Sequence, residues 1–193
     1  MTINSVTDAI QAGIGYVPED RLTQGLVMKK SVGENIVAVI IDRLKGKFGL
    51  LDSEQWDTTV HRWIDDLEIR VASPEVRAQT LSGGNQQRVV LSKWLASSPK
   101  ILILDNATAG IDVAAKSSIH QIIRKMAKQG VGVILISDEI PEVVSNCNRI
   151  AIMRKGRIVQ QLETTNVTES DVQRLVEMTE LHGKEKRLVA SSP

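Results

Sequence analysis

Short aliphatic runs alternate with amphipathic segments along this chain, and that alternation constrains the fold more than any other feature. Two of the runs, Ile101–Leu104 and Val131–Ile136, are continuously apolar, as parallel strands covered on both faces are. A third short run, Ile14–Val17, ends at the breaker Pro18. Between the runs, apolar residues recur at helical spacing, most clearly over residues 111–126. Strands that alternate with helices in this way predict an α/β fold with a mainly parallel sheet.

Cap and breaker residues predict the remaining elements. Ser31, followed by Glu34, has the pattern of a capping box, and the helix it opens is expected to run through Ile41. The other expected elements are a helix from Ser53 with Trp56 and Trp63 on its apolar face, a helix from Ser82 to about Ala96, a short helix after Pro141, strands at Arg149–Met153 and Arg157–Val159, and a helix from Thr168 to about Leu181.

Charge and cysteine content exclude several classes of protein. The 193 residues include 24 Lys+Arg and 23 Asp+Glu, a formal net charge of +1, so nucleic acid is not expected as a partner. Cys147 is the single cysteine, which suits a reducing compartment. The longest aliphatic run, Ile36–Ile41, is too short to span a bilayer. We therefore expect a cytosolic protein.

The segment Leu81–Arg88 carries the strongest local sign of ligand binding. Two glycines after Ser82 open a helix, and they let the backbone approach a ligand closely. The first N–H groups of a helix are unpaired and partly positive, which favours phosphate. A serine cap followed by a glycine turn explains the short Ser-Gly-Gly pattern equally well, but the full octapeptide LSGGNQQR is more specific.

Asp105 lies at the carboxyl end of an aliphatic run, where open parallel sheets bind their ligands. A carboxylate in this place matches the Walker B arrangement, in which it holds Mg²⁺. An aspartate that simply begins a turn occurs at the same place, so Asp105 alone is a weak signal.

Taken together, the order and spacing of these segments resemble the ATP-binding subunits of ABC transporters. Within that family the chain is similar to the C-terminal cassette of two-cassette sugar importers of the ribose, galactose or xylose type. The resemblance covers about residues 8–180 and rests on GIGYVPEDR (13–21), GLVMKKSVGENI (25–36), LSGGNQQR (81–88), ILILD (101–105), TAGID (108–112), VILISDEIPEVV (133–144) and RIAIMRKGRIV (149–159). It implies the P-loop NTPase (RecA-like) fold of an ABC cassette, with a helical subdomain. The partial nucleotide-binding domain would cover residues 1–180, with the helical and Q-loop side at about 24–80, the signature-to-switch region at 81–160, and a polar tail at 181–193.

Site roles follow from the resemblance position by position. The signature motif would comprise Leu81, Ser82, Gly83, Gly84, Asn85 and Gln86, and would contact the γ-phosphate of ATP held by an opposite cassette. Asp105 would be the Walker B carboxylate that binds Mg²⁺. Asp112 would lie in the D-loop at the cassette interface, and Glu19 stands at the Q-loop position, where a typical cassette has Gln. Val27, Met28 and Val32 either face the membrane subunit or pack in the core.

Two departures from the family pattern remove the usual catalytic groups. Asn106 follows Asp105 where an active cassette has Glu. A neutral amide can orient a water molecule but cannot accept its proton. Asp138 stands at the switch position, where an active cassette has His, but other residues are common there in C-terminal sugar cassettes, so Asp138 alone says little. We therefore name no catalytic residue and expect no ATP hydrolysis by this chain alone.

No segment matches the phosphate-binding pattern G-x-x-x-x-G-K-[ST]. In the family this loop lies upstream of the segment that begins at Gly13, and only twelve residues precede Gly13 here. We expect the chain to represent the part of a cassette that follows this loop, with some apolar surface of its sheet exposed.

The resulting hypothesis is an ATP-binding component of a sugar-import ABC transporter, which supplies the signature motif to a composite site. Its partners would be a complete cassette, in the same or another chain, and membrane permease subunits. It would lie at the cytoplasmic face of the inner membrane as a peripheral protein. Two alternatives stay open: a non-catalytic interaction module, and a truncated remnant of such a subunit without ATPase activity.

Overall fold

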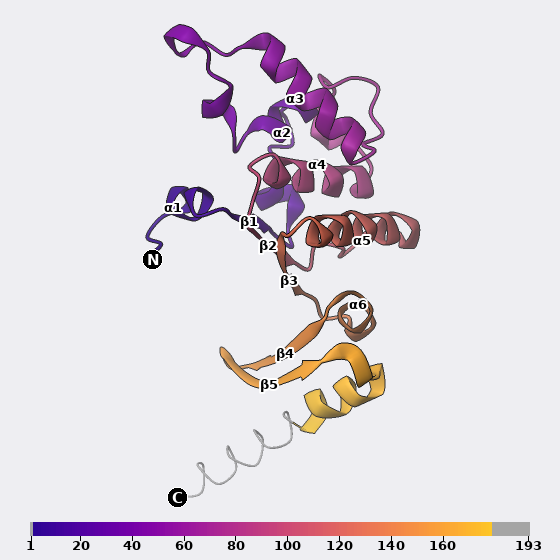
Figure 1. The fold of residues 1–193 in the computed structure, drawn as a ribbon. Helices are drawn as coiled ribbons and strands as arrows, with labels where there is room; N and C mark the ends of the chain where they lie inside the picture. Colours follow the sequence, from indigo (N-terminus) through magenta and orange to yellow (C-terminus); the bar gives the residue numbers. More distant parts are fainter. Residues whose placement is uncertain (1, 179–193) are drawn as a thin grey trace, which may run out of the picture. The chain divides into compact units, whose positions relative to one another are not determined.

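The computed structural model describes residues 2–178, which form two compact units, one ending at Ile136 and the other beginning at Ser137. Figure 1 shows the elements in chain order. The first unit contains α1 (Val6–Gln11), β1 (Ile14–Val17), α2 (Val32–Val37), α3 (Ser53–Asp66), α4 (Gly83–Leu95), β2 (Ile101–Asp105), α5 (Val113–Lys128) and β3 (Gly132–Ile136). The second contains α6 (Ile140–Asn146), β4 (Arg149–Arg154), β5 (Arg157–Glu163) and a helix over residues 169–178.

The predicted parallel sheet is confirmed in the first unit. Its strands lie in the order β1-β2-β3, and all are parallel. Val17 pairs with Leu104, and Leu104 pairs with Leu135. Because neighbouring strands of this sheet are parallel, the carboxyl ends of β1 and β2 lie at the same edge of the sheet. Asp105 is located at that edge.

Only one face of this sheet is covered. Val17, Leu102 and Leu104 are fully buried, and they share a hydrophobic core with residues of α4 and α5. The opposite face carries large apolar side chains that are between 39% and 51% exposed: Tyr16, Ile101, Ile134 and Ile136. The continuous apolar runs had predicted coverage of both faces. That prediction is wrong for the first unit as the structure describes it, because α4 and α5 pack on the same face of the sheet, whereas the expectation of some exposed apolar surface on the sheet is confirmed.

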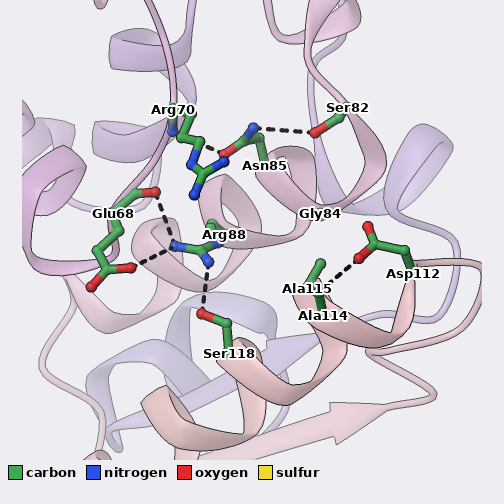
Figure 2. Close-up of a pocket in the computed structure, with 10 residues that line it drawn as sticks. All are labelled: Glu68, Arg70, Ser82, Gly84, Asn85, Arg88, Asp112, Ala114, Ala115 and Ser118. Atoms are coloured by element: carbon green, nitrogen blue, oxygen red, sulfur yellow. Dashed lines mark hydrogen bonds and ion pairs between the residues drawn. The ribbon is translucent and has the colours of Figure 1, made fainter.

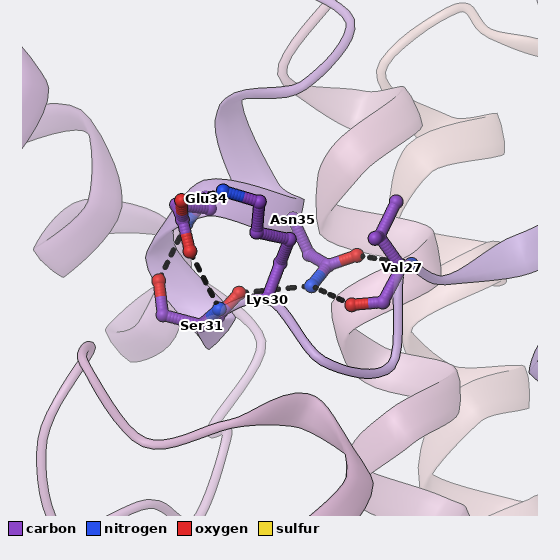
Figure 3. Close-up of polar contacts among 5 residues, drawn as sticks. All are labelled: Val27, Lys30, Ser31, Glu34 and Asn35. Carbon is purple, nitrogen blue, oxygen red and sulfur yellow. Dashed lines mark hydrogen bonds and ion pairs between the residues drawn. The ribbon is translucent and has the colours of Figure 1, made fainter.

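The capping box before α2 is confirmed (Figure 3). The Ser31 hydroxyl accepts a hydrogen bond from the Glu34 N–H at 3.1 Å, and the Glu34 carboxylate accepts one from the Ser31 N–H at 2.8 Å. Asn35 is 2% exposed, and its amide binds both the N–H and the carbonyl of Val27. This side chain therefore fastens the loop before α2 to the helix itself.

The helix α2 is shorter than predicted, since it ends at Val37 and only a 3-10 turn follows at Ile41–Leu44. The residues between are rich in β-branched side chains, which lose rotamer freedom in a helix. Of the three candidate interface residues, Val32 is fully buried and Met28 packs against the core, whereas Val27 is 58% exposed.

Helix α3 packs through its tryptophans, as predicted. Trp56 and Trp63 both lie against the hydrophobic core of the first unit. A Cβ atom on Gly33 would come within 2.5 Å of the Trp56 ring, so only glycine lets α2 and α3 approach this closely. Figure 1 shows α2 next to both α3 and α4. These three helices form the helical part of the unit.

The second unit is built on an antiparallel pair. The predicted strands at Arg149–Met153 and Arg157–Val159 are confirmed as β4 and β5, each extending further than expected. Ile150, Ile152 and Val172 form its small core. The predicted terminal helix is present over residues 169–178. Its last predicted residues and the predicted polar tail at 181–193 lie outside the described residues.

Within residues 2–178, no helix is both long enough and apolar enough to cross a membrane.

Candidate functional site

The helix α4 begins at the segment that the sequence singled out. Ser82 is its N-cap residue, but the Ser82 hydroxyl caps none of the first-turn N–H groups. Instead it accepts a hydrogen bond of 3.1 Å from the Asn85 side-chain amide (Figure 2). The Asn85 amide oxygen in turn accepts from the Arg70 N–H at 2.9 Å. The positive end of the helix is therefore left without the serine cap that a structural role would have supplied.

A cavity of about 320 Å³ lies beside the first two turns of this helix. Its lining comes from the first turns of α4, from the first turns of α5 and from the segment that follows α3. The lining residues are Glu68, Arg70, Ser82, Gly84, Asn85, Arg88, Asp112, Ala114, Ala115 and Ser118. The volume lies at the lower end of the range for small-molecule pockets. Four of the predicted site residues are thus brought together, namely Ser82, Gly84, Asn85 and Asp112.

A second helix end faces the same cavity. Asp112 is the N-cap of α5, and its carboxylate accepts a hydrogen bond of 2.9 Å from the Ala115 N–H. The two helix starts approach closely, because a Cβ atom on Gly84 would lie 2.8 Å from the Cβ of Ala115. Gly84 therefore has a packing role besides the predicted ligand contact. The cavity lies between two positive helix ends, one of which Asp112 already caps.

Arg88 is a part of the site that the sequence reasoning did not single out. Its side chain is 12% exposed and donates to the carbonyl oxygens of Leu67 and Glu68 and, at 2.7 Å, to the Ser118 hydroxyl. The same guanidinium lies 3.7 Å from the Glu68 carboxylate. Arg88 thus holds α4, the end of α3 and α5 together behind the cavity. The available signal was its position at the end of LSGGNQQR, one helical turn beyond Gly84.

The other predicted residues of the motif do not line the cavity. Leu81 packs against the hydrophobic core. Gln86 is 6% exposed, and its amide is used internally: the oxygen accepts from Arg21 at 3.5 Å, and the nitrogen donates to the Ala78 carbonyl at 3.3 Å. Gly83 lies against Arg21, since a Cβ atom there would be 2.9 Å from the guanidinium.

Asp105 has a hydrogen-bond partner within the chain that the sequence did not predict. The Tyr16 hydroxyl donates to the Asp105 carboxylate at 2.8 Å. Tyr16 pairs with Ile103 in the sheet, so strand alternation places Tyr16 and Asp105 on the same face. The hydrogen bond to Asp105, together with partial desolvation and the nearby charges of Asp105 and Glu19, raises the pKa of Tyr16.

A magnesium ion needs about six oxygen ligands, and proteins commonly supply one or two carboxylates while phosphates and water supply the rest. Among residues 2–178, no group of three or more His, Cys, Asp and Glu side chains could hold a metal ion. Asp105 is a single carboxylate, so an Mg²⁺ ion bound there would need its other oxygen ligands from phosphates and water.

None of the remaining predicted positions is among the residues that line the cavity. Asn106 adopts a left-handed backbone conformation with φ of 43°, and its N–H donates to the Ile136 carbonyl at 2.9 Å. Glu19 is exposed two residues after β1. Asp138 is exposed in the second unit, next to Ser137, whose hydroxyl donates to the buried Glu142 carboxylate.

Comparison with known proteins gives concordant matches. A family model described as ABC transporter matches residues 2–109. A ribose import ATP-binding protein of Yersinia pestis is 41% identical over 186 residues, which is 96% of this chain and 36% of that protein. Another, from Escherichia coli O157:H7, is 39% identical over 175 residues, 91% of this chain and 34% of that protein. The chain thus spans about a third of the length of these relatives.

Solved structures show the same fold. A dimeric ATP-binding cassette in a post-hydrolysis state with ADP and Pi gives a TM-score of 0.69 at 20% identity, over 86% of this chain and 69% of that chain. A protein from Clostridium perfringens, part of an ABC transporter complex, gives a TM-score of 0.67 at 26% identity, over 90% of this chain and 67% of that chain.

Proposed function

The chain belongs to the ABC transporter family, and from that premise we propose that it supplies the signature motif to an ATP site shared with a complete cassette. Family membership implies nucleotide binding, typically with Mg²⁺. In this proposal the phosphates held by the partner cassette meet the N-terminal turn of α4. Hydrolysis at the partner's site would then drive uptake of a sugar.

One observation carries the proposal: the uncapped start of α4 faces a cavity that Ser82, Gly84, Asn85 and Asp112 line together. Backbone N–H groups at a helix start bind phosphate directly, and the helix dipole adds a favourable charge interaction. Ser82 is exposed and has a hydroxyl available to donate to a phosphate oxygen, since its oxygen is the acceptor in the bond with Asn85. Arg88 keeps the helix start in place from behind.

The chain's own Walker B region supports a non-hydrolysing role. Asp105 can bind Mg²⁺ through one carboxylate oxygen while Tyr16 holds the other. Asn106 stands beside it, and an amide cannot accept the proton of an attacking water. The divalent ion, where bound, would neutralise phosphate charge. We therefore assign hydrolysis to the complete cassette.

The substrate class and partners follow from the relatives. The similar proteins of Yersinia pestis and Escherichia coli are named for ribose import, so we propose a sugar as the transported solute. A complete cassette and membrane permease subunits would be the partners. They would hold this chain at the cytoplasmic face of the membrane as a peripheral component.

The test is an ATPase assay on the assembled importer that carries Ser82→Arg. A long cationic side chain at the cavity mouth blocks the approach of phosphates to α4, so we expect turnover to be lost. Ser117→Arg is the matched control, because Ser117 is exposed on α5 and does not line the cavity; it should keep turnover. Undiminished turnover in Ser82→Arg would contradict the proposal and favour a non-catalytic interaction module. Asp105→Asn should have only a small effect on turnover.

A further inference from the structure

The side chain of Arg21 connects three segments that are far apart in the sequence. Arg21 begins a π-helical turn, Arg21–Gly25, shortly after β1. One guanidinium nitrogen donates to the Ala109 carbonyl at 3.1 Å, in the loop between β2 and α5. The Nε atom donates to the Gln86 side chain at 3.5 Å, in the first turns of α4.

Gly83 makes room for this guanidinium, and Gly110 lies at ordinary contact distance from it. A Cβ atom on Gly83 would lie 2.9 Å from Nη2 of Arg21. A Cβ atom on Gly110 would lie 4.0 Å from Nη1, and Gly110 also has a φ of +68°, which side chains rarely adopt. Gly83, a predicted nucleotide contact, thus has a second role as the surface against which Arg21 lies.

The partners of Arg21, Gln86 and Ala109, do not line the cavity themselves, but each lies within three residues of one that does. The first turns of α4 carry Ser82 and Gly84 on one wall, and the loop that contains Ala109 ends at Asp112 on the other. Gln86 is itself fixed, because its amide nitrogen donates to the Ala78 carbonyl. Arg21 therefore links the two walls from outside the cavity, in addition to the hydrogen bond between Arg88 and Ser118 and the close approach of Gly84 to Ala115.

We propose that Arg21 is a positioning residue that sets the spacing between the start of α4 and Asp112, and through it the affinity of the shared site for ATP. The predicted effect on ATP affinity rests on the proposed function. The link that Arg21 makes between the two walls does not depend on that function. A guanidinium is required, because its planar fork reaches two acceptors in different directions. A lysine ammonium on a flexible stem reaches one of them at a time.

The first experiment measures ATP turnover by the assembled importer with Arg21→Met, Arg21→Lys and the control Arg62→Met. Arg62 pairs with Asp66 on the exposed surface of α3, so its loss removes a charge but no link to the cavity. We expect Arg21→Met to raise the KM for ATP about 10-fold with kcat within about 2-fold, since a small displacement of a binding group has effects of this order. Arg21→Lys should be intermediate, and Arg62→Met should match the parent. An unchanged KM in Arg21→Met would overturn the nucleotide part of the inference.

The second experiment is hydrogen exchange on the full 193-residue chain, without nucleotide. In Arg21→Met, the amides of residues 83–86 and 109–112 should both exchange faster, while the melting temperature stays close to that of the parent. Unchanged exchange in both segments, or faster exchange throughout the unit, would overturn the coupling.

The two proposals fail in distinguishable ways. Loss of turnover in Ser82→Arg with an unchanged KM and unchanged exchange in Arg21→Met would uphold the proposed function and overturn the role of Arg21. Full turnover in Ser82→Arg with coupled exchange in Arg21→Met would overturn the proposed function and uphold the link between the walls.

Discussion

At the start of α4, polar side chains line an open cavity. At the end of β2, by contrast, the Asp105 carboxylate already accepts a hydrogen bond from within the chain. Ser82 leaves the helix end uncapped, and Arg88 supports it from behind. Asp105 accepts this hydrogen bond from the Tyr16 hydroxyl, and the residue that follows Asp105 is the amide Asn106. The comparison teaches that the polar groups at the start of α4 remain accessible, whereas the carboxylate at the end of β2 is already engaged within the chain.

The largest effect in this comparison is expected from Arg88→Met. Removal of the guanidinium leaves the Leu67 carbonyl oxygen and the Ser118 hydroxyl without their donor in partly buried places, and the Glu68 carbonyl oxygen without its donor in an exposed one. The expected loss is about 3 kcal/mol in the free energy of unfolding, measured by urea denaturation. Glu68→Gln is the control, because the Glu68 carboxylate is 83% exposed and its ion pair is worth under about 1 kcal/mol. Equal losses in the two variants would show that the ion pair, and not the hydrogen bonds, holds the cavity wall.

Gly84→Ala should come next, with a loss of about 1–3 kcal/mol, because the new methyl group would meet the Cβ of Ala115 at 2.8 Å. The matched change is Ala115→Gly, which alone costs about 1 kcal/mol of helix propensity. In the double variant the clash is absent, so the combined loss should be smaller than the sum of the single losses. Additive losses would mean that the loss in Gly84→Ala does not arise from the contact with Ala115.

Tyr16→Phe tests the region at the end of β2 and should have a smaller effect. It removes one hydroxyl whose hydrogen bond to Asp105 is partly exposed, so we expect a loss of about 1 kcal/mol in urea denaturation. Asp105→Asn keeps an oxygen that can accept from the phenol and should lose less than Tyr16→Phe does. A larger loss in Asp105→Asn would mean that the carboxylate has a stabilising partner besides Tyr16.

The smallest expected effect is a shift in titration. Tyr16 is the single tyrosine of the chain, so the ultraviolet absorbance of phenolate reports it alone. Its pKa is raised above the ordinary 10.0, chiefly by the hydrogen bond to Asp105. A raised pKa in the folded state means that the bond stabilises the fold fully below pH 10 and is lost as pH rises through the folded-state pKa. Asp105→Asn should move the midpoint back toward 10.0, and a parent midpoint at or below that value would contradict the geometry.

Much of the fold could be predicted because its signals are local. Runs of aliphatic residues gave β1, β2 and β3, and one cap pattern gave the start of α2 at Ser31. The first helix, Val6–Gln11, and the π-helical turn at Arg21 were not predicted. The former has no buried residue and hence no apolar stripe to reveal it, and the latter depends on contacts with distant segments.

For the candidate site, the sequence alone determined which residues lie near the start of α4 and at the end of β2, because caps, glycines and strand ends act over a few residues. Only the tertiary structure decided how they are used. Tyr16 and Asp105 are 89 positions apart, and their hydrogen bond exists because β1 and β2 pair in one register. Arg21 reaches Ala109, and Arg88 reaches Ser118, only after helices from different parts of the chain pack together. Partners of this kind depend on register and packing over long separations, and no periodicity in the sequence encodes them.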